Sequence, residues 1–210
     1  MSELKRIGLF CGCFDPVHSG HITAAEIFRS AAELDRVYLI PANASYSKYG
    51  ARMESGLHRL HMCRLAAEGH AGIEVSDFEI NAQGVPYTID TVLFFKQRFP
   101  ASGLYLCMGE DTARTVIRWA CFDELKELVT FLVINREDHR VDTGSIVDSG
   151  GTAVFVSHDR DGISSTEIRK RLRSGAQDCQ ALDEKVLHYI KEHALYGTGT
   201  LKKQEGDVSS

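Results

Sequence analysis

Short apolar runs alternate along this chain with longer segments in which apolar residues recur every three or four positions. The short runs predict β-strands, and the helical spacing of the longer segments predicts α-helices. The predicted strands are residues 6–11, 36–41, 73–80, 103–109, 129–135 and 153–157. The predicted helices are residues 20–33, 54–69, 88–98, 111–118, 122–127, 165–174 and 180–193. This alternation is typical of an α/β protein, and we predict a Rossmann-like, doubly wound parallel sheet.

The chain has 210 residues, a length that suits one domain. We predict that residues 1–196 form this domain, with a small helical part at its C-terminal end. Residues 42–53 and 137–152 have no clear periodicity and are predicted to be loops. Residues 197–210 are predicted to be a disordered tail.

The composition argues against several classes of function. Hydrophobic residues make up 43% of the chain and charged residues 25%, which is ordinary for a soluble globular protein. The net charge of −5 argues against a protein that coats nucleic acid. No apolar run approaches the roughly 20 residues that span a bilayer. Because no signal peptide precedes the first strand and the six cysteines lack a disulfide spacing, we expect reduced thiols and a cytoplasmic location.

The most informative segment runs from Cys11 to His21 and reads Cys-Gly-Cys-Phe-Asp-Pro-Val-His-Ser-Gly-His. It connects the first predicted strand to the first predicted helix, and ligands of open α/β sheets bind at such carboxyl ends of strands. The helix N-terminus offers free N–H groups and a partial positive charge, which suit a phosphate. His18 and His21 are three residues apart, so both can face the same anion.

A zinc site is the alternative for this segment, because Cys11, Cys13, His18 and His21 carry zinc-binding groups. One observation argues against it: no Cys-x-x-Cys pair elsewhere in the chain completes a closed site. The Asp-Pro turn before the histidines favours a shaped phosphate loop, and we expect no metal ligands among the side chains.

A second informative segment, Ile-Ser-Ser-Thr-Glu-Ile-Arg-Lys-Arg-Leu, covers residues 163–172. Its hydroxyl groups precede a basic amphipathic helix, and Ser164 or Ser165 is predicted to cap that helix. The segment is either a capped surface helix with a solvated basic face or a second anion site in which Arg169 supplies a charged fork. The chain contains neither a G-x-x-x-x-G-K-[ST] loop nor a G-x-G-x-x-G turn after the first strand. A phosphate site in the first turn would therefore rely on the H-x-G-H residues.

The two segments together resemble the nucleotidylyltransferase superfamily, which carries an H-x-G-H turn and a late I-S-S-T-x-I-R helix start. Between them lie Tyr-Thr-Ile-Asp-Thr at residues 87–91, Gly-Glu-Asp at residues 109–111 and the single tryptophan, Trp119. These follow the order seen in nicotinate/nicotinamide mononucleotide adenylyltransferases. The resemblance covers residues 6–195.

The resemblance implies an enzyme of NAD biosynthesis, in which the phosphate of a pyridine mononucleotide attacks the α-phosphate of ATP and releases pyrophosphate. It implies Mg²⁺, bound mainly through the ATP phosphates. The implied catalytic residues are His18, His21 and Arg169. The implied ATP-binding residues are Gly12, Phe14, His18, His21, Gly109, Asp111, Ser165, Thr166 and Arg169. The implied mononucleotide-binding residues are Cys13, Lys48, Tyr87, Thr88 and Trp119.

The chain also departs from the bacterial nicotinate-type pattern. That pattern has Gly-Gly-Thr where this chain has Cys-Gly-Cys at 11–13, Pro-Pro-His-Lys where it has Ser-Tyr-Ser-Lys at 45–48, and often an aromatic residue where it has Ala120. Cys11 and the 45–48 segment are closer to the eukaryotic type, which accepts both the acid and the amide. The resemblance therefore leaves the acceptor open between nicotinate and nicotinamide mononucleotide.

Two other functions remain as alternatives. One is an adenylyl- or cytidylyltransferase with a different phosphate acceptor, and the other is a non-catalytic nucleotide-binding protein of the same fold. The expected partners are ATP and a pyridine mononucleotide, without nucleic acid or membrane, and a homo-oligomer is compatible with the sequence.

Overall fold

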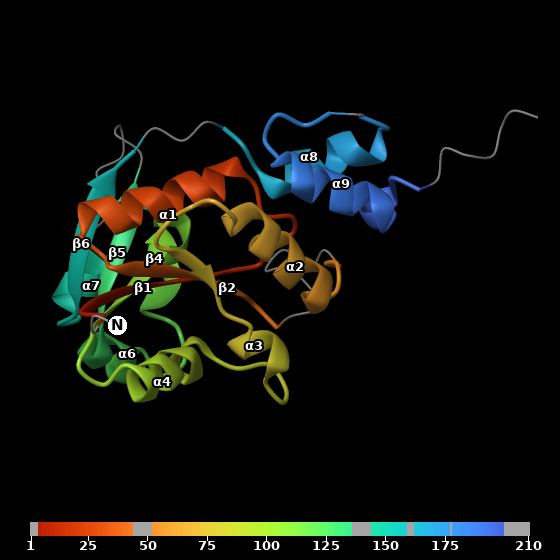
Figure 1. The fold of residues 1–210 in the computed structure, drawn as a ribbon. Helices are drawn as coiled ribbons and strands as arrows, with labels where there is room; N and C mark the ends of the chain where they lie inside the picture. The colour runs from red at the N-terminus through yellow and green to blue at the C-terminus, as the bar shows by residue number, and fades with distance from the viewer. Residues whose placement is uncertain (1–3, 44–51, 136–143, 159–161, 177, 200–210) are drawn as a thin grey trace, which may run out of the picture.

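The computed structural model describes residues 4–43, 52–135, 144–158, 162–176 and 178–199. Within them, six strands form one sheet (Figure 1). They are β1 (Arg6–Gly12), β2 (Arg36–Pro41), β3 (Ile73–Val75), β4 (Gly103–Gly109), β5 (Val129–Asn135) and β6 (Thr152–Ser157). All five strand pairs are parallel, which confirms the predicted parallel sheet.

The order β3-β2-β1-β4-β5-β6 reverses direction between β1 and β4. From β1 the chain winds outward to β2 and β3, and from β4 it winds outward to β5 and β6. Such a switch point leaves a crevice at the carboxyl ends of the two central strands, where α/β proteins bind ligands. The turn that follows β1 contains both candidate histidines.

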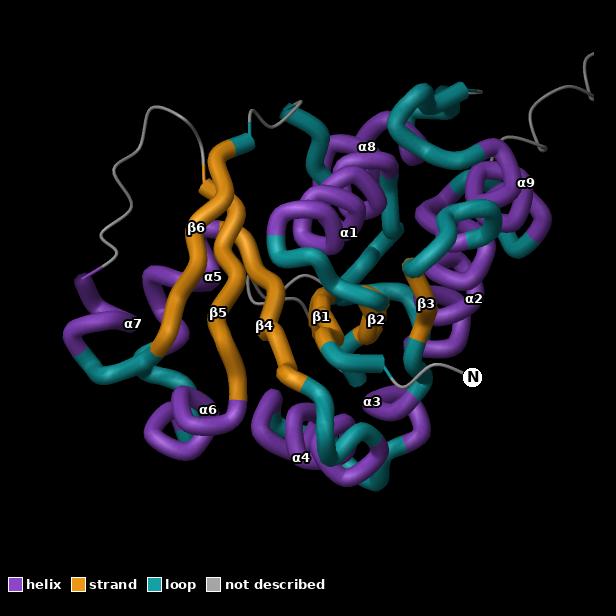
Figure 2. The backbone as a smooth tube through the Cα atoms, turned by 60° about the vertical axis from the view of Figure 1, so that its left-hand side comes forward, coloured by secondary structure: helices purple, strands orange, loops and turns teal. Residues whose placement is uncertain are grey.

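Helices cover both faces of the sheet. They are α1 (Ser19–Ala31), α2 (Gly56–Ala67), α3 (Phe78–Asn81), α4 (Thr88–Arg98), α5 (Glu110–Val116), α6 (Phe122–Leu128), α7 (Gly144–Asp148), α8 (Ser165–Arg173) and α9 (Glu184–Glu192), followed by the 3₁₀ turn η1 (Leu195–Gly197). In Figure 1, α1, α8 and α9 lie above the strands, and α3, α4 and α6 lie below them. Figure 2 shows the strands side by side in the order β6-β5-β4-β1-β2-β3, with α1 above β1 and β2 and with α3 and α4 below the sheet.

The core consists of one apolar cluster on each face, because successive side chains of a strand point to opposite sides. Val37 and Leu39 of β2 belong to the cluster beneath α1, α2, α8 and α9. Tyr38 and Ile40, which alternate with them, belong to the cluster formed with α4 to α7. Helices α8 and α9 therefore share the core of the sheet, so the C-terminal helices stay on the side of the sheet that carries the histidine turn.

The structure differs from the sequence-based expectations in a few segments. The predicted strand 73–80 ends at Val75, and its second half forms the short helix α3. Helix α7 lies within the predicted loop 137–152, and α9 begins at Glu184 rather than at residue 180. At the C-terminus, the Thr198 hydroxyl donates to the carbonyl of Leu195 at 3.0 Å, whereas residues 200–210 lie outside the described part of the chain. None of the helices in the described ranges combines the length and apolar character that crossing a membrane requires.

Candidate active site

The turn between β1 and α1 places the two histidines of the H-x-G-H segment at a helix start. His18 is the N-cap of α1, with an extended backbone, and His21 is the third residue of the helix. The His18 side chain is buried, with 6% of its surface exposed. The two imidazole rings lie 3.8 Å apart between centroids, so a single group can contact both of them.

The hydrogen bonding of His21 determines which ring nitrogen can serve as a donor. The backbone N–H of His18 donates to Nδ1 of His21 at 3.3 Å. A neutral imidazole that accepts at Nδ1 carries its proton on Nε2, and a protonated one also carries a proton there. His21 therefore presents an N–H from Nε2 in either protonation state, as a phosphate-binding residue needs.

Phe14 packs against the ring of His21. Its ring meets His21 edge to face with 5.0 Å between centroids, and only 2% of its surface is exposed. A Cβ on Gly12 would lie 2.9 Å from the Phe14 ring, so glycine is required for this packing. Both residues were predicted to bind ATP. The structure shows that Gly12 packs against Phe14 and that Phe14 packs against His21.

A cavity of about 240 Å³ opens at this turn, on the side of α8. Its lining includes the two histidines together with Ser164 and Ser165. His158, which follows β6, also lines it. The two segments that the sequence singled out thus meet at one cavity, although more than 140 residues separate them.

The start of α8 is attached directly to the turn after β1. Ser164 caps the helix by accepting from the Glu167 N–H at 3.2 Å, as predicted for Ser164 or Ser165. The Ser165 hydroxyl donates to the carbonyl of Pro16 at 2.9 Å. Arg169 donates to the carbonyl of Asp15 at 2.6 Å and to the Thr166 hydroxyl at 3.3 Å. These contacts hold the guanidinium of Arg169 beside the histidine turn.

Asp15 is the buried acid of this arrangement, with 3% of its surface exposed. Its carboxylate accepts from the Tyr196 hydroxyl at 2.7 Å and from the Glu54 N–H at 3.2 Å, and lies 3.8 Å from Arg169. Burial raises the pKa of Asp15, while these hydrogen bonds and the charges of Arg169 and Arg59 lower it. Four separate segments therefore help to keep this carboxyl ionised.

Arg59 of α2 holds three backbone segments together at the carboxyl edge of the sheet. The side chain is fully buried. Its guanidinium donates to the carbonyl of Cys13 at 2.7 Å, of Ala42 at 2.7 Å and of Glu54 at 3.0 Å. These carbonyls belong to the turn after β1, the end of β2 and the segment before α2, so one side chain sets their relative positions.

The remaining predicted residues follow other elements at the same edge. Gly109 ends β4 as the N-cap of α5, and Asp111 is exposed in the first turn of α5. Thr88 begins α4, whose N-cap is the exposed Tyr87. Trp119 follows α5, half-buried against the core cluster of that face. These residues lie outside the lining of the histidine cavity.

Two further predicted residues need separate mention. Cys13 is half-buried, and its carbonyl is one of the three that Arg59 holds. Lys48 lies outside the described residues. The binding roles predicted for both stay predictions.

A second buried acid, Glu79 of α3, lies on the side of α4. It is 6% exposed and accepts from the Thr91 hydroxyl at 2.8 Å. Burial raises the pKa of Glu79, while the hydrogen bond from Thr91 and the charge of Arg59 lower it. Burial also raises the pKa of the Cys11 thiol, and the charge of Glu79 raises it further. Cys11 is therefore a neutral packing group rather than a reactive thiolate.

The arrangement of the side chains indicates whether they can hold a metal ion directly. Across the described ranges, no three or more histidine, cysteine or acidic side chains gather as metal ligands. Cys11, Cys13, His18 and His21 accordingly do not form a shared ligand set. A Mg²⁺ ion that is held by phosphate oxygens and water needs no such cluster, so these residues fit an ion that arrives with its nucleotide.

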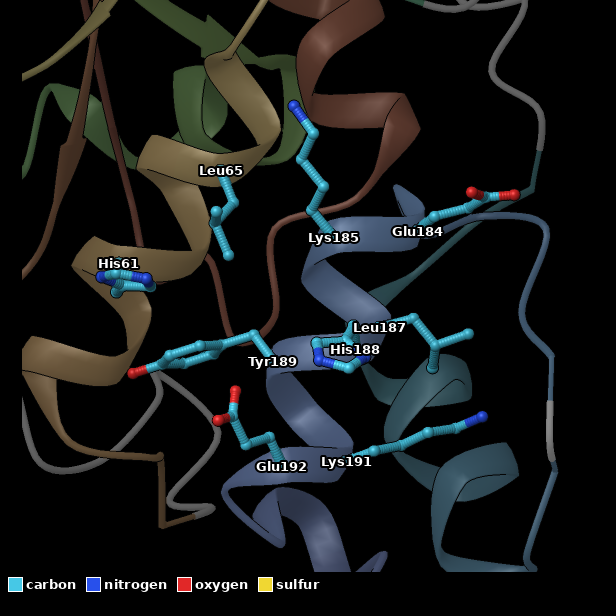
Figure 3. Close-up of a pocket in the computed structure, with 9 residues that line it drawn as sticks. All are labelled: His61, Leu65, Glu184, Lys185, Leu187, His188, Tyr189, Lys191 and Glu192. Carbon is cyan, nitrogen blue, oxygen red and sulfur yellow. The ribbon is translucent and has the colours of Figure 1, made fainter.

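A more open hollow of about 640 Å³ lies between α2 and α9. Figure 3 shows Tyr189 reaching from α9 towards His61 of α2. The Tyr189 ring stacks on His61 at 4.4 Å between centroids. None of the predicted site residues lines this hollow, and its shape is that of a surface groove. The histidine cavity is therefore the candidate active site.

Sequence reasoning did not select His158, Arg59 or Tyr196. His158 could have been found as a polar residue at the carboxyl end of a predicted parallel strand. Arg59 sits in a helix among other basic residues, where exposure is the usual outcome. Tyr196 lies at the edge of the predicted tail, 181 positions from Asp15, and no local pattern connects the two.

Comparison with known proteins agrees with this arrangement. Residues 9–171 match the family model described as Cytidylyltransferase-like. "Nicotinate-nucleotide adenylyltransferase" of Bacillus subtilis is 31% identical over 193 residues, which cover 92% of this chain and 99% of the relative. "Probable nicotinate-nucleotide adenylyltransferase" of Gemmatimonas aurantiaca is 37% identical and covers 91% of this chain and 92% of its own. A Plasmodium falciparum nicotinic acid mononucleotide adenylyltransferase complexed with APC superimposes with a TM-score of 0.76 at 20% identity, covering 93% of this chain and 98% of that one.

The fold and the two joined motifs define a nucleotidyltransferase of the cytidylyltransferase-like class. Within that class, the chain belongs to the nicotinate-nucleotide adenylyltransferase family, because the match to its relatives extends over nearly the whole length of both chains. This confirms the family that the sequence motifs indicated.

We predict that replacing Arg59 by Met destabilises the protein by about 3 kcal/mol, because three backbone carbonyls lose a buried charged donor. The matched control is Arg64→Met on the same helix, which removes a half-exposed pair with Asp77 and should cost less than about 1 kcal/mol. Urea unfolding of both variants measures the difference. Equal losses for the two variants would show that Arg59 does not hold the turn in place.

Proposed function

We propose that this protein transfers the adenylyl group of ATP to nicotinate mononucleotide, giving the dinucleotide and pyrophosphate in NAD biosynthesis. An oxygen of the 5′-phosphate of the mononucleotide attacks the α-phosphorus of ATP. The bond from that phosphorus to the bridging oxygen breaks, and pyrophosphate leaves with the bonding electrons. The observation that carries the proposal is the single cavity at which the H-x-G-H turn and the I-S-S-T-x-I-R helix start meet.

The two joined segments are suited to hold the phosphates of ATP. Phosphoryl transfer needs alignment and charge stabilisation more than covalent help. His21 would donate from Nε2, and His18 lies within ring contact of it. Ser165, Thr166 and Arg169 at the start of α8 would hold the leaving phosphates, because that helix end combines hydroxyls, N–H groups and a fixed guanidinium.

The acceptor would bind along the edge formed by α4 and the segment after α5. Trp119 offers a flat surface for the pyridine ring, and Thr88 offers a hydroxyl and a backbone N–H at a helix start. Tyr87 and Asp90 support that start, since the Tyr87 N–H donates to the Asp90 carboxylate at 2.8 Å. Gly109 would allow close approach to ATP, Asp111 would accept from the ribose of adenosine, and Lys48 would reach the phosphate of the mononucleotide.

Mg²⁺, when bound to the ATP phosphates, would neutralise charge that builds on the leaving pyrophosphate. The proposed location is the cytoplasm: none of the six cysteines forms a disulfide, as is usual in a reducing compartment. Whether the protein forms a homo-oligomer stays a prediction.

The experiment that tests the function is pyrophosphate release from ATP and Mg²⁺, with nicotinate mononucleotide and nicotinamide mononucleotide supplied separately. We expect release with nicotinate mononucleotide and a lower kcat/KM with the amide, because the curated relatives carry the nicotinate name. A higher kcat/KM with the amide would show that this chain prefers nicotinamide mononucleotide. Release with neither compound would favour another acceptor or a non-catalytic binding protein.

We predict that His21→Ala lowers kcat at least about 100-fold, because it removes a donor to the phosphates as charge develops in the transition state. The control is His188→Ala, which changes an exposed histidine on α9. Thermal unfolding of both variants checks that the fold is retained, since His21 also accepts a hydrogen bond at the helix start. A near-normal kcat in folded His21→Ala would exclude the catalytic role.

We predict that Trp119→Ala raises the KM for the mononucleotide and leaves kcat within a fewfold of the original. Stacking on the pyridine ring acts equally in the ground state and the transition state, so its loss weakens binding without slowing the chemical step. Steady-state kinetics at saturating ATP measure both constants. A fall in kcat at constant KM would contradict a stacking role.

A further inference from the structure

The C-terminal end of the described chain reaches back into the active-site turn. Tyr196, in η1, is buried with 5% of its surface exposed. Its hydroxyl donates to Oδ1 of Asp15 at 2.7 Å, and its backbone N–H donates to the Glu54 carboxylate at 3.2 Å. Tyr196 and Ala194 both adopt left-handed backbone conformations, with φ of 54° and 50°, that non-glycine residues rarely adopt. The surrounding contacts therefore fix the tyrosine in place.

Asp15 connects this tyrosine to Arg169 of α8, the helix whose first residue, Ser165, lines the cavity. One carboxylate oxygen accepts from Tyr196, and the other lies 3.8 Å from Nη1 of Arg169. The same nitrogen donates to the Asp15 backbone carbonyl at 2.6 Å. The side chain of Arg169 is itself mostly covered. The position of its guanidinium is thus set by Asp15 on one side and by Thr166 on the other.

We propose that Tyr196 is a positioning residue of the enzyme: its hydroxyl fixes the ionised Asp15 carboxylate, which in turn orients Arg169 towards the triphosphate. This rests on the proposed function for the role of Arg169. Tyr196 itself touches neither nucleotide. Its effect reaches the reaction only through the carboxylate.

The charges around Asp15 explain why the hydroxyl matters. Burial raises the pKa of Asp15, and four groups from different segments oppose this: the Tyr196 hydroxyl, the Glu54 N–H, and the cations Arg169 and Arg59. Burial also raises the pKa of Tyr196, so its hydroxyl remains a donor throughout the working pH range. Removing that donor must raise the pKa of Asp15 further. Protonated Asp15 no longer attracts the guanidinium, and Arg169 keeps only its neutral contacts there.

The test is the pH profile of kcat for Tyr196→Phe, which keeps the ring and removes only the hydroxyl. We expect the midpoint of the acid limb to move up by about one pH unit, with up to about a tenfold loss of kcat at the acid end and less than about threefold at pH 8. The KM for ATP should change less than kcat. A uniform loss of kcat at every pH would indicate a merely structural role and would overturn the proposal.

Tyr189→Phe is the matched control. This tyrosine lies on α9 (Figure 3), and its hydroxyl shares a 2.8 Å hydrogen bond with Nδ1 of His58 rather than with Asp15. The acid limb of the kcat profile of Tyr189→Phe should coincide with that of the unmodified protein. In an Asp15→Asn background, Tyr196→Phe should no longer move the limb, because the titrating carboxyl is absent. A shift that persists in that background would assign it to another group and exclude Asp15.

Unfolding measurements test the Asp15–Tyr196 coupling without any reliance on catalysis. A raised pKa in the folded state means that the contribution of Asp15 to stability is full at low pH and is lost as the pH rises through that pKa. The variant has the higher folded pKa, so Tyr196→Phe should lower the urea midpoint more at neutral pH than at acid pH. An equal fall in the urea midpoint at neutral and at acid pH would overturn the proposed coupling between Asp15 and Tyr196. If the unmodified protein releases no pyrophosphate, the proposed function fails while this measurement still decides the coupling.

A second variant covers the case in which Tyr196→Phe does not fold. Incorporating 3-fluorotyrosine at position 196 keeps the ring and the hydroxyl but lowers the intrinsic pKa of the phenol, which makes it a stronger donor. The acid limb of kcat should then move down rather than up. An unchanged or raised midpoint in that folded protein would contradict the proposal.

Discussion

The active site depends on one buried cation. The guanidinium of Arg59 donates to three backbone carbonyls. They lie in the turn after β1, at the end of β2 and just before α2, which are the segments around the candidate site. Its charge also lowers the pKa of two buried acids. Asp15 lies on the side of the site that faces α8, and Glu79 lies on the side that faces α4. An isolated charge in an apolar interior would be very costly, so the cation and the two acids stabilise one another's burial. The two halves of the candidate site are therefore coupled electrostatically through a residue outside the reacting centre.

The fold explains why such a residue is needed. The switch between β1 and β4 creates a crevice but leaves its walls on separate loops and helices. The turn after β1 must meet α8, which follows β6 at the far edge of the sheet. Ser165 and Arg169 make that connection through the carbonyls of Pro16 and Asp15, and the N–H of Ser19 donates to the carbonyl of Ala181 at 2.8 Å. The relative position of the two motif segments thus results from hydrogen bonds to backbone groups.

The sequence was sufficient to predict what depends on neighbouring residues. The apolar run of β1, the Asp-Pro turn and the H-x-G-H helix start are local, and so are the Ser164 cap and the α8 helix. The prediction of a strand over residues 73–80 was partly wrong. The alternating residues of this segment suit a strand, but the chain turns at Asp77 and buries Glu79 in a short helix. Arg59 could not be predicted, since its partners are carbonyls that any sequence supplies.

The most distant contacts are also those that local pattern cannot reveal. Tyr196 and Asp15 meet across nearly the whole chain, and their hydrogen bond exists only because α9 and η1 share a core with α1 and α8. The packing of the C-terminal helices on one face of the sheet thereby supplies a hydrogen bond that lowers the pKa of an acid beside the histidine turn. Since transfer of an adenylyl group depends on alignment, a residue that fixes a carboxylate can matter as much as one that touches the phosphates. The C-terminal helices are for this reason part of the architecture of the candidate active site.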